Sequence, residues 1–332
     1  MPISTRWPDV RQRASARIAA LLLAVATASA QAQQAVAPAQ SPDWSVEQVT
    51  VTAQAAGPAY WHAQKGEADV WILATVQYLP KDFAWNRNHL AKLLDGTRVV
   101  LLPPRASASL FDAGWFLLTK RSLLYLPDGQ TLDGVLGAPL AARFATARAI
   151  VHRDADHFAG DALPVAALEL EGDFLSAKGL VLAEPADAIE SLARKSNAEV
   201  RYVAKYDAMP SVEAILKLPP DKSRACVEAA INDVEFQNSH ANAAAEAWAV
   251  GDVAGIKANF SDSNVLECLL AIAPEATELE ARATADTVSA IETALNEGGR
   301  AIAVVSIGQL LRKNGVLEKL HADGIAVEGP PQ

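Results

Sequence analysis

Two short apolar stretches decide the fold: Val70-Trp71-Ile72-Leu73-Ala74-Thr75-Val76, and Ala301-Ile302-Ala303-Val304-Val305 near the other end of the chain. Both are short and rich in β-branched residues, which predicts buried strands. Each is followed closely by a glutamine, Gln77 in the first case and Gln309 in the second. Because the strands are far apart in the chain and helical spacing dominates between them, the sequence predicts a mixed α+β (α/β) fold. Its central sheet is built from the N- and C-terminal halves, with a helical block inserted between them.

Shorter patterns extend this interpretation along the chain. We expect one domain over residues 44–330, with a helical region at about 205–297. Residues 115–126 are apolar without a clear period, and we interpret them as a strand. Thr131 is expected to cap a helix that runs to about Val151. Further strands are expected at 45–53, 58–63, 98–102, 199–204 and 325–328.

The first thirty residues are typical of a secretory signal peptide. Four arginines precede an apolar run at residues 18–26, and Ala28-Ser29-Ala30 provides a small-residue cleavage site. We expect cleavage near Ala30 or Ala32, a flexible lead-in at residues 31–43, and a periplasmic or secreted mature protein. The apolar run is shorter than the roughly 20 residues that a membrane span needs, and no other stretch is long enough.

The chain is acidic, with a formal net charge of −10. Residues 1–30 hold four Arg and one Asp, a net of +3, so their removal leaves −13. Such a charge disfavours nucleic acid and anionic lipid as partners.

Two cysteines, Cys226 and Cys268, follow the export signal. An even number of cysteines in an oxidising compartment favours a disulfide, and two buried free thiols are the alternative. Two cysteines so far apart do not form a zinc motif.

Several local motifs occur in a fixed order, and together they resemble the TraB/GumN/Tiki family over about residues 57–328. Beside the two apolar stretches with their glutamines, the resemblance rests on Gly57-Pro58-Ala59-Tyr60-Trp61, Leu126-Pro127-Asp128-Gly129-Gln130-Thr131-Leu132, Ala247-Trp248-Ala249-Val250-Gly251-Asp252 and Gly315-Val316-Leu317. The resemblance implies a sheet with two quasi-symmetric halves, each ending a core strand in a GxxH motif. It also implies metal-dependent peptidase activity, with a Glu after an early strand completing the site.

This chain departs from the family pattern at each of those points. The two tetrads read Ala74-Thr75-Val76-Gln77 and Ser306-Ile307-Gly308-Gln309. Where the family has a Glu the chain has Pro103, and where the family has an Arg-Asn pair it has Arg282 followed by Ala283. Amide oxygens are far weaker zinc ligands than imidazole nitrogens. We therefore expect no metal, no cofactor and no confident catalytic residue.

The prediction is an exported family member that has lost its catalytic chemistry and serves as a binding or scaffold protein in the cell envelope. Its partner would be a protein, a peptide or a polysaccharide-related molecule. The alternative is an active metal-dependent peptidase or hydrolase with zinc or manganese at a relocated site. Candidate residues for that alternative are the loop with His152, Asp154, Asp156 and His157, and the pair Glu169 and Glu171 if these two lie on a strand that faces one cleft. A solvated loop and a charged strand edge are the simpler interpretations of these two groups.

Overall fold

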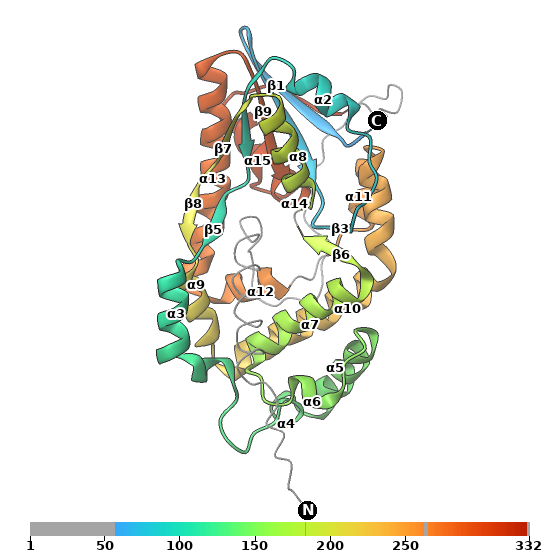
Figure 1. Cartoon of the computed structure of the whole chain (residues 1–332), viewed down its shortest axis with the longest axis vertical. Helices are drawn as coiled ribbons and strands as arrows, with labels where there is room; N and C mark the ends of the chain where they lie inside the picture. The colour runs from blue at the N-terminus through green and yellow to red at the C-terminus, as the bar shows by residue number, and fades with distance from the viewer. Residues whose placement is uncertain (1–56, 183, 262–264, 331–332) are drawn as a thin grey trace, which may run out of the picture.

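The computed structural model describes residues 57–182, 184–261 and 265–330. Its strands gather in the upper part of the view in Figure 1, and most of the helices fill the lower part. The expected signal peptide, the lead-in and the strand at 45–53 lie outside the described residues. Within the described ranges, no helix is both long enough and apolar enough to cross a membrane.

A six-stranded mixed sheet forms the centre of the upper part, in the order β10-β1-β2-β9-β4-β7. Its strands are β1 (Tyr60–Lys65), β2 (Ala68–Thr75), β4 (Thr97–Leu102), β7 (Glu199–Tyr202), β9 (Arg300–Ser306) and β10 (Val327–Glu328). β9 lies parallel between β2 and β4, with Ala74 beside Val305 and Ala303 beside Leu101. The first and last parts of the chain therefore share one sheet, as the sequence predicted.

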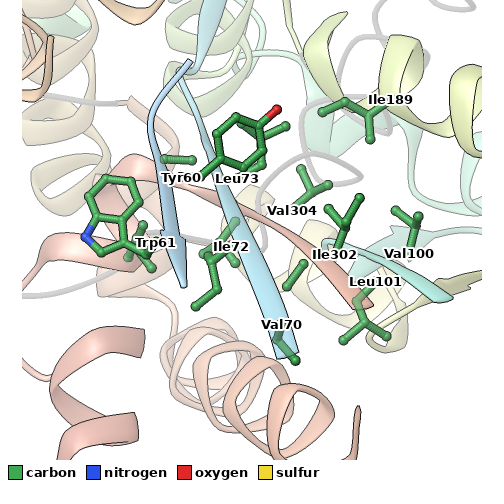
Figure 2. Close-up of a cluster of buried hydrophobic side chains, with 14 of the residues drawn as sticks. Tyr60, Trp61, Val70, Ile72, Leu73, Val100, Leu101, Ile189, Ile302 and Val304 are labelled. Atoms are coloured by element: carbon green, nitrogen blue, oxygen red, sulfur yellow. The ribbon is translucent and has the colours of Figure 1, made fainter. Parts of the chain in front are cut away.

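The central strands are apolar along almost their whole length because both of their neighbours and the covering helices exclude water. In β2, Val70 and Ile72 to Ala74 are fully buried, and in β9 all residues from Ala301 to Val305 are buried. Figure 2 shows side chains of β1, β2, β4 and β9 together with Ile189 in this core. Ile189 lies on α8 (Glu184–Lys195), which packs against β4 and β7.

The remaining strands form two small ladders outside the main sheet. β3 (Tyr78–Pro80) pairs antiparallel with β6 (Leu180–Leu182), and β5 (Arg105–Ser107) pairs parallel with β8 (Lys205–Asp207). β3 follows directly after Gln77, so this pairing ties the exit of β2 to the helical part of the molecule.

Two groups of helices complete the molecule. The helices from residue 88 to 178 are α2 (Asn88–Leu94), α3 (Leu110–Thr119), the 3-10 helix η1 (Arg121–Leu124), α4 (Leu132–Leu136), α5 (Ala138–Ile150), α6 (Ala155–Phe158) and α7 (Leu163–Lys178). Those after α8 are α9 (Met209–Leu216), α10 (Pro220–Ala249), α11 (Val253–Ala258), α12 (Val265–Ile272), α13 (Pro274–Glu297), α14 (Ile307–Leu311) and α15 (Val316–Ala322). Helices α9 to α13 fall within residues 205–297, and α3 to α7 fill an earlier segment.

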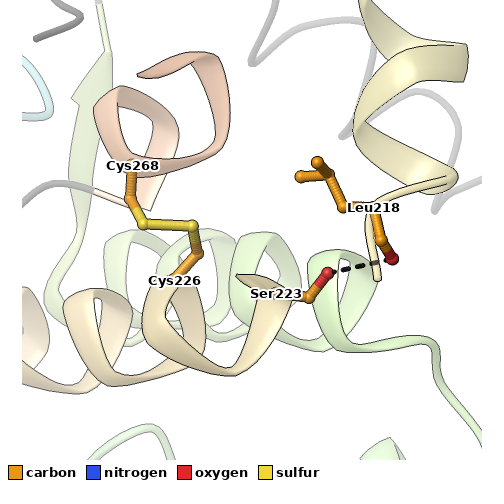
Figure 3. The surroundings of a disulfide bond; sticks show 4 residues. All are labelled: Leu218, Ser223, Cys226 and Cys268. Atoms are coloured by element: carbon orange, nitrogen blue, oxygen red, sulfur yellow. Dashed lines mark hydrogen bonds between the residues drawn. A yellow bond between two sulfur atoms is a disulfide. The ribbon is translucent and has the colours of Figure 1, made fainter. Parts of the chain in front are cut away.

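A disulfide joins Cys226 of α10 to Cys268 of α12, with 5.4 Å between the two Cα atoms (Figure 3). Near it, the Ser223 hydroxyl donates to the carbonyl oxygen of Leu218, the residue before the turn into α10. Both cysteines of the chain are used, so the protein has no free thiol. The pairing that the sequence favoured is present.

The strand predicted at residues 115–126 is wrong. This segment contains the second half of α3 and then η1. Helix α3 starts earlier than the apolar run suggests, because the Ser109 hydroxyl accepts a hydrogen bond from the backbone N–H of Asp112 and caps the helix. The helix predicted from Thr131 to Val151 does begin at a Thr131 cap, but Gly137 divides it into α4 and α5 with a φ of +78°.

Candidate functional site

The carboxyl ends of the three central parallel strands meet at one edge of the sheet. Thr75, the last residue of β2, lies beside Ser306, the last residue of β9. On the other side of β9, β4 ends at Leu102 and continues into Pro103. Neighbouring strands lie about 4.8 Å apart, and ligands in open α/β sheets bind at such carboxyl ends. The positions at which the resemblance implies two motifs and a Glu therefore share this edge.

Gln309 is held by contacts on the protein interior. The Ser306 hydroxyl caps α14 by accepting from the Gln309 backbone N–H at 3.2 Å. The side chain of Gln309 is buried, and its Nε2 lies 3.5 Å from the hydroxyl of Thr287 on α13. That hydroxyl in turn donates to the carbonyl oxygen of Ala283 at 2.7 Å. The amide thus contributes to the packing of α14 against α13.

Gln77 has a different environment from Gln309. It lies half-buried in the bend between β2 and β3, and its amide forms no hydrogen bond with another of the described residues. An amide supplies two N–H donors and one carbonyl acceptor, so Gln77 keeps this capacity for a bound molecule.

Ala74, where the resemblance implies a glycine, has no positive φ. It is fully buried, and its carbonyl oxygen accepts a hydrogen bond from Trp248 Nε1 at 2.7 Å. Trp248 is also fully buried and lies edge-on to Trp85, with 5.2 Å between the ring centroids. This contact fixes the end of β2 against the C-terminal part of α10.

A second pair of motifs meets close to this contact. Gly251 has a φ of +74°, and a Cβ built on it would lie 2.9 Å from the carbonyl oxygen of Gly57. The following residue, Asp252, caps α11 by accepting from the Gly255 backbone N–H at 2.8 Å. Two motifs that are almost two hundred residues apart in the sequence are therefore neighbours, and glycine is required at residue 251.

Arg282 is separate from the two glutamines in its contacts. It is exposed on α13, and its charge interacts with Tyr206. The Tyr206 hydroxyl donates to Asp286 at 2.6 Å. Burial and the bond to Asp286 raise the pKa of Tyr206, whereas the charge of Arg282 lowers it. Arg282 forms no hydrogen bond with Gln77, Ser306 or Gln309 among the described residues.

The donor set at the sheet edge does not fit a catalytic metal. The positions where the resemblance implies metal ligands hold two neutral amides and Pro103, which has no side-chain donor. Protein zinc sites use imidazole, thiolate and carboxylate ligands. In the part of the chain that the structure describes, no group of three or more His, Cys, Asp or Glu side chains is arranged to hold a metal ion.

The candidate residues for a relocated site have other partners. Asp154 caps α6 by accepting from the His157 backbone N–H, and the His157 ring lies 3.0 Å from a carboxylate oxygen of Asp173. Glu169 and Glu171 lie on helix α7, so the condition that they share a strand is not met. Apolar residues on every side of this helix obscured its period in the sequence.

A buried carboxyl pair contacts Tyr78, the residue that follows Gln77. The Tyr78 hydroxyl lies 2.6 Å from Glu171 Oε1 on α7 and 3.2 Å from Asp233 Oδ2 on α10, and all three side chains are buried. Burial, then the charge of Glu171, raises the pKa of Asp233 to about 8, although hydrogen bonds with Ser261 and Tyr78 lower it. Burial also raises the pKa of Glu171.

One proton accounts for this geometry. A phenol has a single hydrogen, so a proton kept on one of the two carboxyl groups allows both close contacts to be hydrogen bonds. We therefore assign a retained proton to the Glu171–Asp233 pair. Sequence reasoning missed Asp233, although a signal existed: it lies on the same helical face as the apolar residues Ala230 and Val234.

Comparison with known proteins gives one match. The model of the TraB/PrgY/gumN family matches residues 59–329. No curated protein and no solved structure matches the chain. The matched range runs from the start of β1 to the end of β10, so it includes the whole six-stranded sheet and the edge at which Gln77 and Gln309 lie. The chain belongs to the TraB/PrgY/gumN family.

Proposed function

We propose that this protein is a catalytically impaired member of its family that acts as a binding or scaffold protein in the cell envelope. The observation that carries the proposal is the chemistry at the carboxyl edge of β2, β9 and β4. Two amides and a proline stand where the resemblance implies two imidazoles and a carboxylate. A water molecule is activated for attack on a carbonyl when a metal lowers its pKa, and these side chains supply no ligand set for that metal.

The same edge retains the capacity to bind polar molecules. The amide of Gln77 can donate to a carbonyl and accept from an N–H or a hydroxyl group. Gln309 and the Trp248–Ala74 contact hold the surrounding backbone in place. Peptides and polysaccharides both present the groups that an amide recognises, and the envelope location rests on the expected signal peptide.

Binding can be tested by thermal shift with short peptides and with oligosaccharides from envelope polymers. A ligand that binds the folded state raises the melting temperature. We expect this rise in the wild type and a smaller rise in Gln77→Ala. Gln64→Ala is a matched control, because Gln64 is exposed near the opposite end of β2, at the turn between β1 and β2. Equal shifts in the wild type and both variants would contradict a role for the Gln77 edge.

A thermal shift does not distinguish a binding protein from a slow enzyme, because a bound ligand stabilises both. Catalysis is therefore measured in a separate assay. We expect no chelator-sensitive cleavage of a fluorogenic peptide library in the presence of zinc or manganese. Metal-dependent cleavage by the mature wild type would instead support the alternative, an active peptidase or hydrolase with a relocated site.

A further inference from the structure

Helix α3 presents a strongly apolar face to solvent. This α3 face consists of Leu110, Phe111, Gly114, Trp115 and Leu118, which share one side of the helix at the spacing of one and two turns. The exposed fractions are 94% for Leu110, 77% for Phe111, 58% for Trp115 and 82% for Leu118. Figure 1 shows α3 on the outer flank of the molecule, beside α9.

The opposite side of the same helix packs against the rest of the molecule. Phe116 is buried, and Leu117 packs against the core of the helical part. Lys120, which follows the helix, pairs with Glu213 of α9. A helix that is apolar on all sides is typical of an element covered on all sides. Four of the five large apolar side chains that are exposed within the described ranges lie on this helix, and Val250 is the other.

The area of the α3 face suits a protein interface. At about 200 Å² for each large apolar side chain, the four exposed fractions leave on the order of 600 Å² on one copy. A stable interface removes about 800 Å² from each partner. The α3 face would supply most of that area, whereas a monomer rarely exposes an apolar patch of this size.

The pattern of the face is symmetric about its centre. Leu110 and Leu118 each lie four residues from Gly114, so an antiparallel copy crossing at Gly114 would bring Leu110 against Leu118 at both ends. Gly114 has no side chain to separate the two backbones. Antiparallel packing also places the opposite ends of the two helix dipoles side by side.

We propose that a second copy of this chain covers the α3 face, in a two-fold symmetric dimer with the two α3 helices antiparallel. The net charge of −10 argues against an anionic lipid surface as the occupant. The proposal is independent of the function of the Gln77 edge, because α3 contributes no residue to it.

Sedimentation velocity on the mature chain tests the dimer. We expect a species of twice the chain mass at micromolar concentration, and a monomer for the double variant Phe111→Glu/Leu118→Glu with an unchanged circular dichroism spectrum. Val250→Glu is the matched control, since it places the same charge on an exposed apolar residue elsewhere, and it should remain dimeric. A monomeric wild type, or a dimer that persists in the double variant, would overturn the proposal. A monomer that sediments with anionic lipid vesicles would assign the face to a membrane.

Cysteine cross-linking tests the geometry without disrupting the surface. Both native cysteines are bonded, so an introduced cysteine is the single free thiol. A Cβ at Gly114 meets no atom within 4 Å, and Gly114→Cys should therefore fold normally. Mild oxidation should convert this variant to a covalent dimer. Thr119→Cys, exposed at the margin of the same helix, should cross-link far less, and equal cross-linking of both variants would contradict the antiparallel crossing at Gly114.

Discussion

At the scale of single residues, the pair Glu171–Asp233 makes stability depend on pH. The pKa of Asp233 is about 8 in the folded protein, against an ordinary value of 3.8. The folded protein therefore keeps a proton that the unfolded chain has already lost above about pH 4. Because protons then favour the folded state, the free energy of unfolding should fall as the pH rises from about 4 to about 8.

Asp233→Asn should remove this dependence. An amide cannot ionise, yet its oxygen can still accept a hydrogen bond from Tyr78. We expect the variant to be more stable than the wild type at pH 8, by about 3–4 kcal/mol, and similar to it at pH 5. Urea unfolding at both pH values measures the difference. Asp128→Asn is the control, because it makes the same change at an exposed residue. A variant that is less stable than the wild type at pH 8 would show that Asp233 is ionised and stabilising.

Gly251 gives a second prediction at this scale. Its φ of +74° and the short distance to the Gly57 carbonyl oxygen leave no room for a side chain. Gly251→Ala should therefore lower the free energy of unfolding by about 2 kcal/mol. Gly172→Ala is the matched control: residue 172 lies in the middle of α7 with open space around it, and alanine should stabilise that helix by up to about 1 kcal/mol. Thermal or urea unfolding compares the two, and equal effects would contradict the account of Gly251.

Some residue contacts could not be predicted from the sequence. The motifs locate Gln77 and Gln309, since each follows an apolar run that ends a strand. That the Gln309 amide contacts Thr287, whereas the Gln77 amide has no partner among the described residues, depends on how α13 crosses the sheet. Such packing joins elements from different parts of the chain and leaves no local pattern.

At the scale of elements, continuous apolar runs made β2, β4 and β9 predictable, because a strand buried on both faces needs no alternation. The prediction of a strand at residues 115–126, which include the second half of α3, was wrong for the same physical reason. The residues of α3 are apolar on the inner side, where Phe116 is buried, and on the outer side, where Leu118 is exposed. Without a polar side there is no period to separate helix from strand.

The disulfide between α10 and α12 should contribute to the free energy of unfolding. Its cysteines are 42 positions apart, and closing a loop of this length restricts the unfolded chain by about 4 kcal/mol. The double variant Cys226→Ala/Cys268→Ala should lose about 2–4 kcal/mol of unfolding free energy in urea. Reduction should destabilise the wild type in the same way and leave the double variant unchanged. A wild type that is insensitive to reductant would show that the bond contributes little.

At the scale of the whole molecule, the chain has a central sheet built from its two ends but not the ligand residues that the resemblance implies at the edge of that sheet. The match spans residues 59–329, and the edge where the resemblance places a metal site carries amides, a hydroxyl and a proline. The substitutions are compatible with good packing: Ala74 is buried without strain, and Gln309 has a hydrogen-bond partner. This combination supports our proposal of a binding or scaffold protein.

The most direct test of this account is the metal content of the mature wild type, purified without chelator or affinity metal and measured by mass spectrometry. We expect far less than one zinc or manganese ion per chain. The variant Gln77→His/Gln309→His/Pro103→Glu, prepared in the same way, should gain metal if the edge still has the geometry of the family site. One tightly held metal ion per wild-type chain would contradict the account and make the active hydrolase the leading interpretation.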